Sequence, residues 1–240
     1  FNIAFGMAGA TLQRDKVAPE ADAFTFATLA GVDGISKATA ATYADASDFL
    51  AALLEAKNVM DEDEVPEENR ILYATPTLLN SIMALDTTKS REVLNAFSVT
   101  KKVPQSRFYT AINLLDGKTA GEELGHYKKA EAVYTLTTDT SITSGKTYYT
   151  KSGSTYTAVE SPNVSNISTY YELTAAGGKD INFLIVHKPA IIKFDKHIAS
   201  DIIAPANNPN SDAYISKYRK YGLVDVYKNK VAGIYLSHKA

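Results

Sequence analysis

The chain has 240 residues, of which 45% are hydrophobic and 22% charged, and its formal net charge is −2. This is ordinary globular composition with enough apolar residues for a core, and the charge balance excludes a protein that wraps nucleic acid by bulk positive charge. Cysteine is absent, which excludes disulfides, thiolate metal sites and a cysteine nucleophile. No apolar run approaches the roughly 18 residues of a membrane span, and the first residues lack the basic segment of a secretory signal.

The start of the chain predicts a loop followed by a helix. Residues 1–16 are small and mixed, which indicates a loose entry segment. Ala18-Pro19-Glu20 predicts a helix start, because proline suits the first helical turn and early acidic residues favour the positive end of the helix dipole. Gly31 predicts the end of this helix.

Residues 42–60 give the clearest helical pattern, with apolar residues at helical spacing and either Thr42 or Asp45 as the cap. The acidic run Asp61-Glu-Asp-Glu64 follows. It predicts a solvated loop beyond the helix, because the glycine-hinged spacing of a calcium loop is missing.

A strand, cap, proline and helix series comes next and indicates an α/β layer. Residues 70–75 predict a short buried strand. Residues 76–85 predict a helix with Thr75 as its cap and proline at its first position. Residues 99–103 and 108–112 predict two further strands.

The composition changes near Lys128. Residues 133–173 hold six of the chain's 15 tyrosines together with many threonines and few aliphatic residues. This pattern predicts four short strands, at 133–137, 146–150, 155–159 and 170–173, with a hairpin turn at 151–154. The simplest account is a small β module of about 45 residues, inserted at an exposed site of a host domain.

Five tyrosines of this module are candidate contacts for a glycan or a host surface. For the same side chains, cross-strand packing inside the module is the favoured interpretation. The candidates are Tyr148, Tyr149, Tyr156, Tyr170 and Tyr171.

The pattern at the end of the chain indicates a structural segment rather than a catalytic one. Two apolar runs at 181–186 and 190–194 are separated by His187-Lys-Pro189, a polar loop follows at 205–212, and residues 231–236 predict a closing strand. Between the loop and that strand, tyrosines alternate with basic residues. This pattern favours a polar subunit interface; a platform for single-stranded nucleic acid and plain surface are the alternatives. The interface candidates are Tyr214, Tyr218, Arg219, Tyr221 and Tyr227.

Catalytic motifs are missing: the sequence has no Gly-x-Ser-x-Gly elbow, no Walker A loop and no dinucleotide fingerprint. Asp195, His197 and Asp201, with His187 nearby, form the one group that could support a hydrolase or hold a metal. That chemistry requires the side chains to converge. We therefore expect no enzyme activity, no cofactor and no metal.

Several stretches resemble the major capsid proteins of tailed bacteriophages with the Hong Kong 97-like fold. The order and spacing of these stretches carry the resemblance, and residues 133–173 lie outside it. The matching stretches are 17–24, 65–76, 181–188, 205–213, 218–221 and 226–235.

The resemblance implies an α+β fold with an axial and a peripheral domain and a small all-β insertion. Residues 1–128 and 177–240 would form the capsid core, and residues 129–176 the inserted domain. Within the core, residues 18–30 would match the end of the spine helix. Residues 42–112 and 181–204 would build the axial domain, while 222–236 would return to the peripheral domain.

The same resemblance implies a structural subunit that forms pentamers and hexamers around double-stranded DNA, with weak contact to the DNA at the inner face of the shell. Scaffold, portal and decoration proteins are further partners, and a membrane is not. Such a protein is made in the cytoplasm of the bacterial host and ends in the virion capsid. The alternatives are a nanocompartment shell of the same fold and a surface-binding phage structural protein that acts through the β module.

Members of this family carry a long N-terminal arm and an extended loop ahead of the stretch that matches Pro19-Glu-Ala-Asp22. Almost nothing precedes that stretch here. We therefore expect that the sequence as given does not close into shells.

Overall fold

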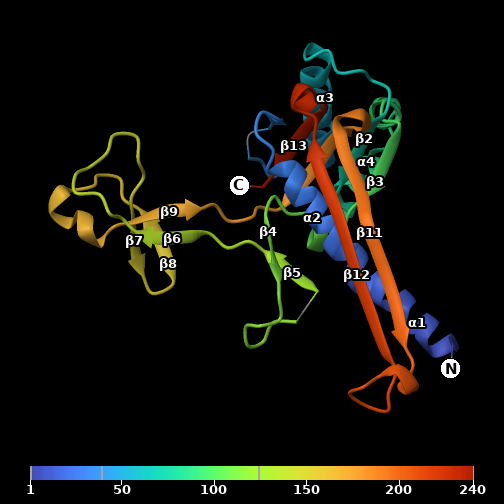
Figure 1. The fold of residues 1–240 in the computed structure, drawn as a ribbon. Coiled ribbons are helices and arrows are strands. Elements are labelled where there is room, and N and C mark those ends of the chain that lie inside the picture. Colours follow the sequence, from blue (N-terminus) through green and yellow to red (C-terminus); the bar gives the residue numbers. More distant parts are fainter. Residues whose placement is uncertain (1, 39, 124, 240) are drawn as a thin grey trace. The chain divides into compact units, whose positions relative to one another are not determined.

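A computed structural model describes residues 2–38, 40–123 and 125–239 and shows a mixed α+β protein (Figure 1). The chain forms two compact units, one of residues 21–110 with 180–240 and the other of residues 1–20 with 111–179. In the part of the chain that the structure describes, no helix has the length and apolar character needed to cross a membrane. The α+β class expected from the sequence is confirmed.

The larger unit is built on a five-stranded sheet. Its order is β1 (Ser36–Lys37), β13 (Ile234–His238), β10 (Ile181–His187), β2 (Arg70–Ala74) and β3 (Val99–Lys102). The central strand β10 runs antiparallel to both of its neighbours, and each edge strand runs parallel to the strand beside it.

Strand β10 is buried along its whole length. Because successive side chains of a strand point to opposite faces, Phe183 and Ile185 enter one core, and Leu184 and Val186 enter another. A bulge between Ile181 and Phe183 shifts the alternation, so Ile181 joins the core of Leu184. The sheet is therefore covered on both faces.

Three helices cover the first face: α3 (Ala46–Glu62), α4 (Pro76–Leu85) and α5 (Thr88–Asn95). The predicted cap Asp45 is confirmed, since its carboxylate accepts hydrogen bonds from the N–H groups of Ser47 and Asp48 at 2.7 and 3.0 Å.

Two details of this layer differ from the prediction. Helix α3 runs to Glu62, so the acidic run begins inside its last turn rather than beyond it. Helix α5 was not predicted, because it is short and largely polar. It depends on a capping box in which Thr87 and Ser90 bond each other's backbone N–H groups.

The second face of the sheet packs against Phe26, Leu29 and Ala30 of helix α2 (Ala18–Ala30), which ends before Gly31 as predicted. Phe26 meets Phe108 edge to face, with ring centroids 4.9 Å apart. The prediction of a strand at 108–112 is wrong. A 3-10 turn at Gln105–Arg107 comes just before this stretch, where Tyr109 makes an isolated bridge to Asp180.

The prediction of a loop over residues 1–16 is also wrong. Helix α1 (Asn2–Leu12) and a π-helical turn (Gln13–Val17) lead into α2 without a non-helical residue between them. Proline within a helix cannot donate to the carbonyl four residues before it. Just ahead of Pro19, the N–H of Ala18 donates to Gln13, five residues back, and this wider spacing carries the helix past the proline.

A long two-stranded ribbon leaves the sheet after β10. Strand β11 (Ile191–Ile203) pairs antiparallel with β12 (Ile215–Val226), with one bulge between Asp195 and His197. β10 and β13 are neighbours in one sheet, and residues 191–203 belong to the ribbon. The prediction that residues 181–204 belong to an axial domain and residues 222–236 to a separate peripheral domain is therefore wrong. A 3-10 turn at Lys188–Ala190, which contains Pro189, separates β10 from β11.

The smaller unit contains a hairpin and a four-stranded sheet. The hairpin pairs β4 (Ile112–Leu115) with β5 (His126–Lys129). The four strands predicted for the β module are confirmed with shifted ends. In sheet order they are β6 (Val133–Leu136), β9 (Tyr171–Ala175), β7 (Tyr149–Ser152) and β8 (Thr155–Ala158). The predicted domain boundaries at 129 and 176 stay a prediction.

Gly178 marks a close backbone crossing at the base of this module. The N–H of Gly178 donates to the carbonyl of Ala130 at 2.8 Å, and the N–H of Ala130 donates to that of Ala111 at 3.1 Å. A Cβ atom on Gly178 would lie 2.2 Å from the oxygen of Ala111, so only glycine fits where these three segments meet.

The two-sided burial of β10 gives a direct prediction. We expect Leu184→Ala to lower the free energy of unfolding by about 2–5 kcal/mol, because it leaves a cavity in a filled core. Leu136→Ala makes the same chemical change at a side chain that is 55% exposed, and should cost less than about 0.5 kcal/mol. Urea unfolding of both variants measures the difference, and equal losses would contradict the assignment of β10 as the centre of the core.

Candidate functional site

The ribbon exposes apolar side chains on both of its faces. Directly opposed residues of an antiparallel pair share a face, so the register assigns each side chain. Ile198 and Ile202 lie on the face of Tyr218, while Phe194 lies on the other face with Tyr221. The exposed fractions of Phe194, Ile198 and Tyr221 are 51%, 57% and 56%. We call the exposed set the ribbon patch: Phe194, Ile198, Ile202, Tyr221 and Leu223.

The predicted interface residues are divided by this geometry. Tyr218 lies on one face of the ribbon, and Arg219 and Tyr221 lie on the other, where the guanidinium of Arg219 is 5.8 Å from the ring centre of Tyr221. Tyr214 precedes β12 and Tyr227 follows it, both exposed. The five residues therefore do not form one continuous surface, and their role at an interface stays a prediction.

Sequence reasoning singled out only Tyr221 of the ribbon patch. Phe194, Ile198 and Ile202 recur every fourth residue among mostly polar neighbours, a spacing that would place all three on one face of a regular strand. The bulge after Asp195 instead puts Phe194 on the face opposite to Ile198 and Ile202.

The acid–base group considered for a hydrolase does not assemble. Asp195 lies opposite Gly222 and Asp201 opposite Lys217, and the bulge between them places the two carboxylates on opposite faces of the ribbon. Asp195 forms an ion pair with Lys220 at 3.1 Å. His187 is buried at the end of β10, and the side chain of His197 lies outside the described residues. Among the residues that the structure describes, no three or more His, Asp or Glu are grouped to hold a metal ion.

Two tyrosines proposed as surface contacts are buried. Tyr148 and Tyr170 have ring centroids 5.9 Å apart and form the small core of the β module with Ile167. The prediction that they contact an outside ligand is wrong. The aromatic residues of so short a module are needed to fill its interior.

The other tyrosines of the module form a half-buried cluster on its sheet. Tyr134 stacks on Tyr156 with centroids 4.1 Å apart, and Tyr149 and Tyr171 meet this pair edge to face. The Nζ atom of Lys151 lies 5.5 Å from the ring centre of Tyr156 and 5.9 Å from that of Tyr171. We call these four residues the tyrosine cluster. Tyr134 was not among the predicted contact residues, although it lies in the predicted strand at 133–137 of the same sheet.

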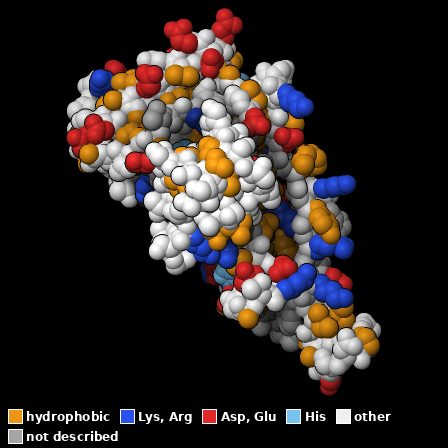
Figure 2. Space-filling view, turned by 90° about the vertical axis from the view of Figure 1, so that its left-hand side faces the viewer, with side chains coloured by type: hydrophobic (Ala, Val, Ile, Leu, Met, Phe, Trp, Pro, Cys, Tyr) orange, Lys and Arg blue, Asp and Glu red, His pale blue; other side chains and the backbone are white. Residues whose placement is uncertain are grey.

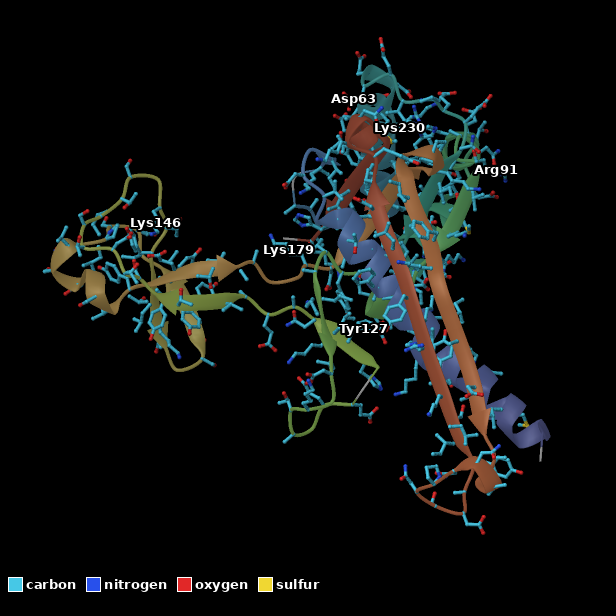
Figure 3. All side chains as sticks on the ribbon, viewed as in Figure 1. Asp63, Arg91, Tyr127, Lys146, Lys179 and Lys230 are labelled. Carbon is cyan, nitrogen blue, oxygen red and sulfur yellow. The ribbon has the colours of Figure 1, made fainter. Side chains whose placement is uncertain are left out.

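A charged network ties the module together around Lys146 (Figure 3). Its ammonium group lies 2.8 Å from Asp139 and 2.9 Å from Glu172, and the Tyr148 hydroxyl donates to Asp139 at 2.6 Å. The hydrogen bonds to Asp139 and Glu172 raise the pKa of Lys146. The hydrogen bond from Lys146 lowers the pKa of Asp139, and hydrogen bonds from Thr137 and Lys146 lower the pKa of Glu172. The network links segments far apart along the module, which indicates a structural role.

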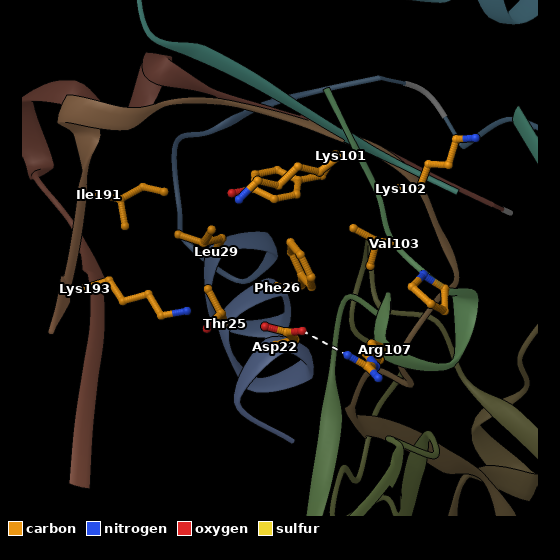
Figure 4. A pocket seen from close by; sticks show the side chains of 12 residues that line it. Asp22, Thr25, Phe26, Leu29, Lys101, Lys102, Val103, Arg107, Ile191 and Lys193 are labelled. Atoms are coloured by element: carbon orange, nitrogen blue, oxygen red, sulfur yellow. Dashed lines mark hydrogen bonds and ion pairs between the residues drawn. The ribbon is translucent and has the colours of Figure 1, made fainter. Parts of the chain in front are cut away.

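A pocket of about 310 Å³ opens beside β3 in the larger unit (Figure 4). Its residues come mainly from α2, β2, β3, the 3-10 turn at Gln105–Arg107 and β11, so no single stretch of the sequence marks it. Asp22 and Arg107 form an ion pair across one side at 3.2 Å. We call it the basic pocket: its apolar residues include Phe26, Leu29, Val103 and Ile191, and its cations are Lys101, Lys102, Arg107 and Lys193.

Comparison with solved structures shows a distant likeness to a phage protein. A solved structure from Mycobacterium phage Che8 is similar over 98% of this chain and 62% of that chain, with 13% sequence identity and a TM-score of 0.46. The chain thus spans less than two thirds of the length of that protein. No family model and no curated protein matches the sequence. A likeness of this degree fixes neither the fold family nor the function.

The environment of His187 predicts a pH dependence. Burial lowers the pKa of His187, and the nearby charges of Arg70 and Lys230 lower it further. The unfolded chain therefore binds this proton more tightly than the folded chain, so the free energy of unfolding falls as the pH drops below the ordinary histidine value of 6.5.

We expect His187→Gln to reduce the fall in urea midpoint between about pH 7.5 and about pH 5.5, relative to the unaltered chain. His238→Gln is the matched control and should leave the fall unchanged. The same fall in all three proteins would show that His187 does not couple folding to pH.

Proposed function

We propose that this chain is a structural subunit of an icosahedral shell, of the Hong Kong 97-like kind found in tailed phages, and that it works by binding further copies of itself. The observation that carries the proposal is the ribbon patch. The α+β fold and the sequence stretches that resemble capsid proteins support it.

Exposed apolar side chains on both faces of a ribbon favour a protein partner. A two-stranded ribbon has no inner face of its own, and isolated hairpins are marginally stable in water. Each apolar side chain that a second copy covers contributes about 25 cal/mol per Å² of buried area. Because Phe194 and Ile198 point in opposite directions, one ribbon offers contacts to neighbours on two sides. A closed shell requires such contacts with several neighbouring subunits.

The partners and location that go with this role are part of the proposal. The copies would form pentamers and hexamers, and a near-neutral chain would contact packaged double-stranded DNA only weakly at the inner face of the shell. Scaffold, portal and decoration proteins are further partners. The role is structural and not catalytic, and its place is the virion capsid after synthesis in the host cytoplasm.

Removal of the ribbon patch tests the proposal. We expect the unaltered chain, of 26.0 kDa, to show a mass that rises with concentration in sedimentation velocity. Ile198→Ser with Ile202→Ser, on one face, and Phe194→Ser with Tyr221→Ser, on the other, should each weaken this association about tenfold or more, because each removes apolar area worth more than about 1.4 kcal/mol.

The control is Leu136→Ser, which removes a similarly exposed side chain outside the ribbon and should leave the mass unchanged. All of these side chains are exposed, so the variants should keep their stability within about 0.5 kcal/mol. An unaltered chain that stays monomeric at every concentration, or ribbon variants that associate as the unaltered chain does, would contradict the proposal.

The tyrosine cluster favours a second candidate function, in which the β module binds a glycan on a host surface. Tyr134, Tyr149, Tyr156 and Tyr171 are half-exposed, and aromatic side chains give large contact areas at low entropic cost. Much of this area is already engaged, since the ring of Tyr156 stacks on that of Tyr134 and is also approached by the ammonium of Lys151. Packing therefore accounts for most of the cluster.

A glycan array with the full chain distinguishes the two roles. If the module binds glycans, Tyr149→Ser should abolish the signal and Tyr227→Ser, an exposed tyrosine in the other unit, should retain it. The shell proposal predicts no signal for any of the three proteins. A signal that is insensitive to Tyr149→Ser would exclude the tyrosine cluster as its source.

A further inference from the structure

We infer that the basic pocket receives the acidic loop of residues 61–68 from a second copy of this chain, so that copies join head to tail. This inference rests on the proposed self-association and names the residues of one of its contacts. The pocket and the loop both belong to the larger unit, and each can be described within it.

The chemistry of the basic pocket selects an anionic partner with a small apolar anchor. Four cations and one carboxylate line it, and Asp22 is already paired with Arg107. Lys102 donates to Asn80 at 2.6 Å, whereas the ammonium group of Lys193 has no hydrogen bond or ion pair among the described residues. The apolar side chains below this rim favour burial of an aliphatic group.

The acidic loop has the complementary character. Its sequence is Asp61-Glu-Asp-Glu-Val-Pro-Glu-Glu68, which begins with the last two residues of helix α3 and holds six carboxylates. Arg70 pairs with Asp61 at 2.7 Å and Lys57 pairs with Glu67 at 3.0 Å, which leaves four carboxylates without an ion pair in the described structure. Acidic side chains gather at the top of the view in Figure 2, the end at which Figure 3 labels Asp63. Pro66 is exposed in the middle of the loop, with carboxylates on both sides.

The acidic loop is also held in one conformation before any partner binds. The side chain of Arg70 is buried, with 2% of it exposed. Its Nε donates to the carbonyl of Pro66 at 3.0 Å and its Nη2 donates to that of Val65. A loop fixed in this way loses little conformational entropy on binding, which raises its affinity for a matching pocket.

The positions of loop and pocket exclude closure within one copy. Strands β2 and β3 run parallel; the loop enters β2 at Arg70, and the pocket lies at the far end of β3, beside Lys101 and Lys102. Four residues of strand, about 13 Å, separate these ends. Because Arg70 holds the loop in place, these two patches at opposite ends of the strand pair meet only between copies, and such heterologous contacts close into rings or extend into filaments.

Charge reversal with complementation tests this inference in the full chain. We expect Lys101→Glu with Lys193→Glu to weaken self-association about tenfold or more in sedimentation velocity, and Glu64→Lys with Glu68→Lys to do the same. A mixture of the two variants should associate again, because the reversed pocket of one attracts the reversed loop of the other. All four substitutions in one chain should also restore association. Association of the unaltered chain should weaken as salt is raised.

Two control variants each reverse one charge outside both patches, in the same directions as the test variants: Lys118→Glu and Glu160→Lys, at exposed positions of the smaller unit. They should associate as the unaltered chain does. Thermal melting verifies that every variant is folded. Charge-reversed variants that keep full association, or that lose it and do not recover on mixing, would overturn the inference. The inference would also be overturned if a double-stranded DNA oligonucleotide bound the monomer and this binding were lost only in the variant with Lys101→Glu and Lys193→Glu.

The two proposals fail in different ways. If ribbon variants lose association and charge reversal has no effect, self-association stands and the contact between pocket and loop is wrong. If the mixed charge-reversed variants recover association and the ribbon variants keep full association, the pocket contact stands and the ribbon is not the interface.

Discussion

The larger unit depends on the burial of β10 from both sides. A strand whose side chains all lie in the interior needs a layer on each face, and the chain supplies α3, α4 and α5 on one and α2 with the base of the ribbon on the other. Asn182 sits at the bulge in this strand, where its amide donates to Ala41 at 2.8 Å and so ties the segment before α3 to the sheet. The helices, the neighbouring strands and this segment are all positioned by one central strand.

The same constraint explains why the ribbon is exposed. The sheet ends at His187, and the turn with Pro189 directs the chain away from it. Only the base of the ribbon, through Ile191, Val224 and Val226, returns to the core. Beyond that base the alternation of a strand continues, but the larger unit supplies no second layer, and the apolar side chains of the ribbon patch stay in solvent. A surface of this kind is suited to contact between molecules.

Charge is organised around the same sheet. Buried Arg70 fixes the acidic loop at one end of β2, while lysines and an apolar floor form the basic pocket at the far end of β3. A net charge of −2 for the whole chain conceals this separation. Electrostatic complementarity between such ends sets the orientation of a contact more than its strength, whereas the ribbon patch supplies apolar area. The two surfaces therefore carry different parts of the proposed assembly.

The elements with local signals could be predicted from the sequence. Asp45 and Pro76 mark helix starts, the apolar run of β10 marks a buried strand, and the tyrosine-rich segment marks a small β module. The pairing of the strands, the continuation of the helix past Pro19, and the burial of Tyr148 against the exposure of Ile198 became known from the fold. The basic pocket, too, is assembled from elements that lie far apart in the sequence. Local patterns fix backbone conformation, but burial and pocket formation depend on residues far apart in the chain, which only the folded arrangement brings together.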